Sequence, residues 1–241
     1  MGTSGAGNVW DKPTGEVEGR IWDDVADVED ILALLKINNL VTEANTDLLH
    51  TAMVAPAVVT GVSPSVTHPT PLIFPDLLQV VKALNSGFTI SKGINRIGFV
   101  EVKELGRLYT ALVSDALIRI GGEPYNVAKV DVWGPKAYYF GQNMEASMKE
   151  FMSGHLLPAL QKYGAPFARS DEIRNVTFDT VLDAILERLG PGAKASSNSW
   201  RAIVYGANMR VRGTRAREAL GFEWAGDDAG IADAVGTFLR R

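Results

Sequence analysis

The sequence predicts an α/β fold. Segments typical of buried strands alternate with segments in which apolar residues recur every three or four positions, the spacing of one helix face. The chain has 241 residues, 46% of them hydrophobic and 22% charged, which suits a globular domain with a sizeable core. Only about four segments are strong strand candidates, which is few for a complete doubly wound sheet of this length.

The first part of the chain predicts one helix and one strand. The first 24 residues are rich in glycine and acidic residues and predict a loop. Residues 25–44 carry an apolar repeat that predicts a helix, and residues 50–56 predict a buried strand that ends at proline. Residues 61–75 contain four prolines. They predict a long irregular connection, of a kind that often carries function.

The rest of the chain predicts more helices than strands. The cleanest amphipathic pattern covers residues 105–120 and stops at two glycines. Strands are expected at 97–102 and 136–140. The other helices are expected at 75–84, 144–155, 178–189, 215–220 and 231–239.

Composition excludes several classes of function. The sequence has no cysteine, so disulfides and thiolate ligands are excluded, which fits a reducing compartment. Its net charge of −4 does not favour nucleic acid, and no apolar run approaches the ~20 residues of a membrane span. The three histidines share no ligand spacing, so no metal site is expected. Without a visible signal peptide, we expect a cytoplasmic protein.

Two short motifs resemble cofactor and catalytic signatures. Gly5 and Gly7 begin a dinucleotide-binding pattern, but Trp10 stands at its last glycine, so we interpret the segment as a loop. Tyr125 and Lys129 have the spacing at which a lysine lowers the pKa of a tyrosine base. They follow a glycine- and proline-containing loop, and the spacing aligns two side chains only in a helix, so coincidence is favoured.

Arginines are concentrated near the C-terminus, at Arg210, Arg212, Arg215 and Arg217. A solvated helix, with Glu218 as a local partner, is the favoured interpretation. The functional alternative is a clamp for an anion or a diphosphate, because guanidinium binds phosphate through two hydrogen bonds.

Four segments together resemble extended short-chain dehydrogenase/reductases, especially fungal nucleoside-diphosphate-sugar epimerases. They are residues 3–7, 51–56, 99–105 and 206–222, in the family's order. The resemblance implies the C-terminal half of a Rossmann-like parallel sheet plus a small C-terminal substrate-binding region. It implies one partial domain over residues 1–241, with a sheet remnant in 1–60 and mostly substrate-binding structure in 61–241.

The resemblance also implies a set of site residues for a small-molecule substrate. The family's catalytic serine falls near Ser4 or Gly5, with Gly5 in the better register, and Glu101 replaces a histidine at a strand-to-helix junction. Ser4 and Glu101 are the predicted catalytic residues. The predicted substrate-binding residues are Thr3, Pro56, Thr60, Arg210 and Arg215.

Departures from the family's pattern limit what the resemblance implies. The first four strands and the glycine fingerprint have no counterpart, and a reading frame that begins upstream of Met1 would account for this. The predicted helix at 25–44 carries Lys36 but no tyrosine, because no tyrosine precedes Tyr109. The resemblance therefore implies NAD(P) as cofactor, but we expect that this chain alone does not bind it.

Three functions remain open. The first is an NAD(P)-dependent oxidoreductase or epimerase by descent. The second is a cofactor-independent cyclase, isomerase or dehydratase that uses the inherited cleft. The third is a non-catalytic binding paralogue. Because missing strands leave a sheet edge and an apolar face uncovered, we expect a homo-oligomer or a partner chain.

Overall fold

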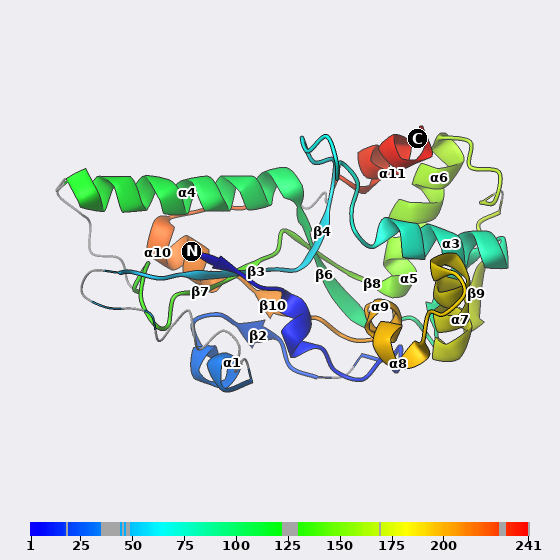
Figure 1. The fold of residues 1–241 in the computed structure, drawn as a ribbon, viewed down its shortest axis with the longest axis horizontal. Helices are drawn as coiled ribbons and strands as arrows, with labels where there is room; N and C mark the ends of the chain where they lie inside the picture. Colours follow the sequence, from blue (N-terminus) through cyan, green and yellow to red (C-terminus); the bar gives the residue numbers. More distant parts are fainter. Residues whose placement is uncertain are drawn as a thin grey trace.

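The computed structural model describes residues 1–17, 19–34, 44, 46, 49–121, 130–168, 170–226 and 230–240. It confirms the α/β class. A parallel sheet with the long helix α4 occupies one end of the elongated molecule, and a group of shorter helices occupies the other end (Figure 1). Tyr125, Lys129 and Lys36 lie outside the described residues.

The first sheet has the order β1-β3-β7, and all its neighbours are parallel. Its strands are β1 (Gly2–Thr3), β3 (Met53–Pro56) and β7 (Tyr138–Gly141). The strands expected at 50–56 and 136–140 are confirmed as β3 and β7. Among the described residues, β1 forms an edge of this sheet.

Alternate side chains of this sheet enter two different clusters. Val54 and Tyr139 pack in the cluster that contains α4 (Val102–Gly121) and α10 (Thr214–Leu220). Met53 and Tyr138 belong to the cluster on the other face, which contains α1 (Val28–Leu34). Because successive side chains of a strand point to opposite faces, the strand needs helices on both sides. Figure 1 shows α4 and α1 on opposite sides of the sheet.

The remaining strands form three small sheets. In one, β4 (Val58–Thr60) is parallel to β6 (Arg96–Glu101), which is antiparallel to β8 (Met144–Ser147). The other two sheets are parallel pairs: β5 (Gly87–Ile90) with β9 (Ile173–Val176), and β2 (Trp22–Asp23) with β10 (Val211–Arg212). Of these strands, only β6 is expected from the sequence.

Most predicted helices are confirmed, and several short ones are added. The confirmed helices beyond α4 and α10 are α3 (Phe74–Leu84), α7 (Phe178–Leu189) and α11 (Ile231–Leu239). The additional short helices are the 3₁₀-helix η1 (Ala6–Val9), α8 (Ala195–Asn198) and α9 (Trp200–Ile203). The predicted N-terminal loop is therefore wrong where β1, η1 and β2 lie. The start of the helix expected at 25–44 is confirmed as α1.

The helix expected at 144–155 is wrong in its first turn. Met144 pairs with Phe99 in β8, and the helical segment begins at Met148. Ser147 ends the strand and caps the helix, because its Oγ accepts a hydrogen bond from the Glu150 backbone N–H. The segment continues as α5 (Met148–Glu150), a π-helix η2 (Phe151–Leu156) and α6 (Leu157–Lys162).

Candidate functional site

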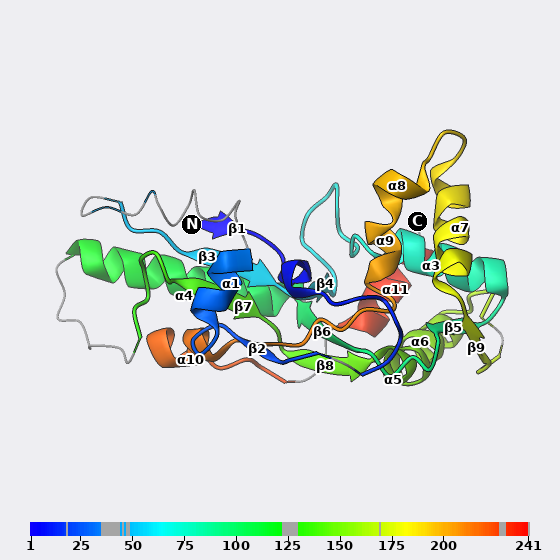
Figure 2. The same ribbon diagram turned by 90° about the horizontal axis from the view of Figure 1, so that it is seen from below.

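A cavity of about 900 Å³ lies where β1 and β3 end and the chain turns through β4 into the loop before α3. Its walls are mostly apolar. Figure 2 shows α8 and α9 beside α7, with the loop on the other side of α9. Open α/β sheets bind their ligands outside the carboxyl ends of the parallel strands, so the position of this cavity favours a ligand site.

Two predicted site residues line the cavity directly, and two lie beside its wall. Pro56 and Thr60 line it. Ser4 precedes the lining residue Gly5, and its Oγ accepts a hydrogen bond from Asn8 Nδ2 at 2.9 Å. Glu101 is next to two residues that line the cavity. Thr60 is its register partner in β4, and Val102 follows it in the chain.

Glu101 is held close to the chain turn at Gly61. A Cβ on Gly61 would lie 2.8 Å from Glu101 Cγ, and φ at Gly61 is 81°, so only glycine fits there without strain. Lys103 Nζ lies 3.7 Å from Glu101 Oε1. The carboxylate therefore has a cationic neighbour and sits just behind the cavity wall.

Tyr138 approaches Ser4 from the sheet. Burial raises the pKa of the Tyr138 phenol well above its ordinary value, and the neighbouring Ser4 and Asn8 lower it by less. A phenol with a raised pKa stays protonated at neutral pH and can donate a hydrogen bond, but it does not supply a phenolate base.

The other three predicted substrate-binding residues point elsewhere, and their roles stay predictions. Thr3 Oγ1 lies 2.6 Å from Tyr109 Oη, between β1 and α4. Arg215 is buried, and its guanidinium donates to the backbone carbonyls of Asp131 and Asp24. Arg210 lies in a different polar cluster.

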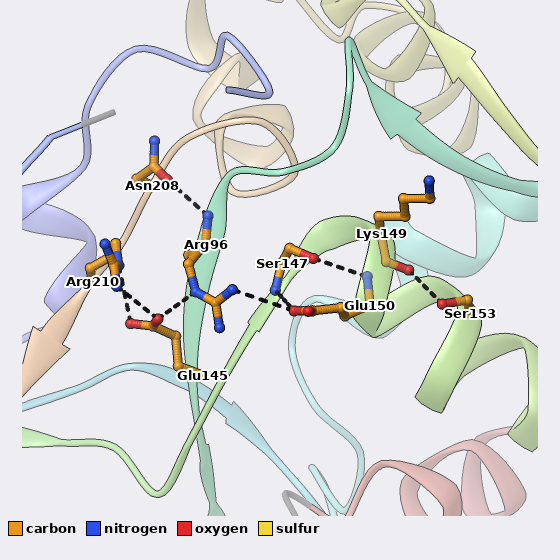
Figure 3. Close-up of polar contacts among 8 residues, drawn as sticks. All are labelled: Arg96, Glu145, Ser147, Lys149, Glu150, Ser153, Asn208 and Arg210. Carbon is orange, nitrogen blue, oxygen red and sulfur yellow. Dashed lines mark hydrogen bonds and ion pairs between the residues drawn. The ribbon is translucent and has the colours of Figure 1, made fainter. Parts of the chain in front are cut away.

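That cluster joins β6, β8 and the segment before β10 (Figure 3). Arg96 Nε donates to Glu145 Oε1 at 2.6 Å, and Arg210 Nη2 donates to the same oxygen at 3.2 Å. Arg96 also lies 3.6 Å from Glu150, whose pKa is lowered chiefly by the backbone N–H of Ser147. Two guanidiniums here meet two carboxylates.

The predicted site residues do not include a group of charged side chains at the cavity. Asp76, at the start of α3, is 3% exposed and lines the cavity together with Arg201 of α9. Arg201 Nη1 donates to Asp76 Oδ2 at 2.8 Å, and Arg188 Nε donates to Oδ1 at 2.8 Å. Trp200 also lines the cavity, and the Arg201 guanidinium lies 4.7 Å from the centre of its ring.

Sequence reasoning could reach only part of this group. The proline-rich loop is expected to carry function, and it supplies His68 and several prolines of the wall. Asp76 and Arg201 are 125 residues apart and follow no motif. Only the fold brings them together.

The described residues do not form a dinucleotide cradle. Such a cradle needs a glycine turn that leads into a helix, with open space for a pyrophosphate over the glycines. Here η1 has only four residues, and a Cβ on Gly7 would lie 2.5 Å from the Trp10 ring. The indole therefore fills the space beside Gly7. The turn at Gly5 and Gly7 therefore does not form a pyrophosphate cradle.

Two other kinds of feature are absent from the residues that the structure describes. These residues contain no group of three histidine, aspartate or glutamate side chains arranged to hold a metal ion. None of their helices is long and apolar enough to cross a membrane. The cytoplasmic location stays a prediction.

No protein-family model matches the sequence, and no curated protein matches it significantly. Solved structures do match. The human epimerase family protein SDR39U1, solved with NADPH, is 15% identical, has a TM-score of 0.52 and is matched over 98% of this chain and 64% of its own.

Two other structures give the same result. The terminal R domain of the myxalamid PKS-NRPS biosynthetic pathway is 11% identical, with a TM-score of 0.54 and coverage of 99% of this chain and 57% of its own. The dTDP-glucose 4,6-dehydratase DesIV from Streptomyces venezuelae, solved with NAD and DAU, is 16% identical, with a TM-score of 0.53 and coverage of 99% and 59%. The chain thus spans between 57% and 64% of these structures. It has the Rossmann-like fold of the short-chain dehydrogenase/reductase, epimerase and dehydratase structures, which confirms the predicted resemblance at the level of the fold.

Proposed function

We propose that this chain is the substrate-binding part of an epimerase-, dehydratase- or reductase-like protein, and that its cavity binds a small molecule. One observation carries the proposal: the cavity lies at the carboxyl ends of β1 and β3, with mostly apolar walls and a few polar groups. The structures with this fold include enzymes that act on small molecules.

We propose that the chain alone does not bind NAD(P). The human structure contains NADPH and the dehydratase contains NAD, but the Trp10 ring takes the space beside Gly7. Calorimetric titration with NADH and NADPH tests this. We expect no micromolar binding to the chain by itself. Micromolar affinity for either nucleotide would overturn the proposal and restore an ordinary oxidoreductase or epimerase.

The two alternative functions use the same cavity and can be separated. A cofactor-independent cyclase, isomerase or dehydratase needs one acid or base at the wall, and Ser4 and Glu101 are the predicted groups. Once a bound substrate is known, Glu101→Gln and Ser4→Ala should lower turnover and leave its affinity within about threefold if the chain is an enzyme. A non-catalytic paralogue binds the same ligand and shows no turnover in any variant.

We also propose that a second copy of this chain covers the β1 edge. The contact between Thr3 and Tyr109 places one side of α4 next to β1. Farther along α4, at helical spacing from Tyr109, Val113 is 45% exposed, Leu117 63% and Ile120 83%. Among the described residues β1 is an edge strand, and an edge strand beside an apolar helix face favours association.

Size-exclusion chromatography with light scattering tests the association. We expect an oligomer for the wild type and a monomer for Leu117→Glu. Val66→Glu, at a 91% exposed position of the loop, is the matched control and should stay oligomeric. A stable wild-type monomer contradicts the second copy and leaves a different partner chain as the occupant.

A further inference from the structure

We infer that the ligand of the cavity carries an anionic group and that Arg201 binds this group. The inference rests on the proposed function, because it names the class of ligand that the same cavity takes. It starts from a charge imbalance that the fold creates at one wall.

The group formed by Asp76, Arg188 and Arg201 holds more positive than negative charge. Both oxygens of the Asp76 carboxylate are occupied, Oδ1 by Arg188 and Oδ2 by Arg201. Two guanidiniums therefore share one carboxylate, which leaves one positive charge uncompensated. Of this group, Asp76 and Arg201 line the cavity, and Arg188 is not among the lining residues. An anion would complete the balance.

Arg201 is already fixed in place for such a contact. Its Nη1 is held by Asp76, and its plane lies against Trp200. Its Nε is buried and has no hydrogen-bond partner within the described structure. Within the described structure, the hydrogen bond to Asp76 uses Nη1 and leaves Nη2 to donate to a ligand oxygen. A guanidinium that is held before binding loses little freedom when an anion arrives.

The other residues of the cavity wall indicate the chemistry of the rest of the ligand. Trp200 is 48% exposed and lines the cavity with Trp10 and Tyr205. The Tyr205 hydroxyl is engaged, because it donates to the Ile73 carbonyl at 3.2 Å. The aromatic and aliphatic walls suit an apolar body. The expected ligand class is therefore a small carboxylate or similar monoanion with an apolar or aromatic body.

Two probes of similar shape, one anionic and one neutral, test the effect of ligand charge separately from the fit to the cavity. Tryptophan fluorescence is used to titrate the chain with 2-naphthoate and with neutral 2-naphthalenemethanol, and Trp200 and Trp10 report the occupancy. We expect the wild type to bind the carboxylate at least about tenfold more tightly, as a charge-assisted hydrogen bond provides. The preference should weaken as salt is added.

Three variants assign the preference to a residue. Arg201→Gln should bind the two probes equally and keep the affinity for the alcohol. Arg201→Lys keeps the charge and the pair with Asp76, so it should retain part of the preference and serves if Arg201→Gln does not fold. Arg96→Gln is the matched control, because Arg96 also shares a carboxylate but does not line the cavity. Circular dichroism verifies the fold of each variant.

The outcomes separate the two proposals. Equal affinity of the wild type for both probes overturns the anionic ligand and leaves the cavity as a binding site. Binding of neither probe overturns the cavity function and the inference with it. Loss of the preference in Arg96→Gln, with Arg201→Gln and Arg201→Lys unchanged, assigns the anion to the other cluster and overturns the role of Arg201.

Discussion

Two clusters of this molecule have the same core, one carboxylate shared by two arginines, and differ in what surrounds it. Asp76 joins Arg188 and Arg201 at the cavity, and its side chain is 4% exposed. Glu145 joins Arg96 and Arg210 on the β6–β8 sheet, and its side chain is 20% exposed (Figure 3). The second cluster has an additional carboxylate, Glu150, and the first has none within the described structure.

The difference shows why arginine density alone is a poor guide to an anion site. The C-terminal arginines stand out in the sequence, yet Arg210 is paired within a balanced cluster and Arg215 is buried. Arg201 is not part of an arginine-rich segment of the sequence. It nevertheless borders a cavity, and within the described structure it shares its carboxylate partner, Asp76, with Arg188. Net charge at a wall, and not the number of arginines in a segment, decides whether a ligand anion is favoured.

The largest expected effect is the loss of the buried carboxylate at the cavity. Asp76→Ala leaves Arg188 and Arg201 together without their counter-charge. We expect the free energy of unfolding to fall by about 3 kcal/mol, near the lower end for breaking a buried ion pair because both arginines are partly exposed. Urea denaturation measures this. A loss below about 1 kcal/mol would show that solvent already screens the cluster.

A third carboxylate sharpens the comparison because it is buried and backbone groups hold it. Asp24 accepts hydrogen bonds from the backbone N–H groups of Phe140 and Arg215, both at 2.8 Å. Burial raises the pKa of its carboxyl from 3.8 to about 7, although the two N–H groups and the Arg215 charge oppose this. Asp24 therefore joins β7 to the start of α10 with a carboxylate that is costly to ionise.

The sign of the pH effect follows from the raised pKa. The folded state binds more protons than the unfolded state between about pH 4 and pH 7, so this contribution to stability is lost as pH rises through 7. Between pH 6 and pH 8 we expect a loss of about 1.4 kcal/mol. Denaturation at each pH should show a smaller loss for Asp24→Asn. An Asp24→Asn variant with an unchanged pH dependence would assign the titration to another group.

The more exposed cluster should respond less to loss of its carboxylate. In Glu145→Ala, Arg96 keeps Glu150 as a neighbour and Arg210 gains water. We expect a loss of about 1 kcal/mol in the free energy of unfolding, as is typical of a largely solvated network. The comparison with Asp76→Ala under the same conditions is the measurement. Equal losses in the two variants would contradict the distinction between the clusters.

The same contrast shows how far the sequence could predict the molecule. The amphipathic helices α3, α4 and α7 and the strands β3 and β7 follow local patterns that burial imposes, and they are confirmed. β9 is missed because it pairs with β5 across the chain and carries polar, half-exposed residues. Met144 is misassigned to a helix because its spacing to Met148 fits a helix equally well.

The candidate site divides in the same way. Pro56 ends a predicted strand, Thr60 follows it, and both line the cavity. The partners of Arg201 are set by the packing of α7 against both α3 and α9, which no short spacing in the sequence reveals.

The smallest expected effect tests whether charge imbalance alone makes an anion site. Glu150→Gln gives the second cluster the composition of the first, two arginines and one carboxylate. Glutamine can keep the cap with Ser147, so the fold should be unchanged. Because Arg96 and Arg210 face solvent and no cavity, we expect 2-naphthoate affinity to rise less than twofold at low salt. A tenfold rise in the affinity for 2-naphthoate would show that charge imbalance binds the anion without an enclosing wall. The proposal for Arg201 would then be supported only by the residues that line the cavity.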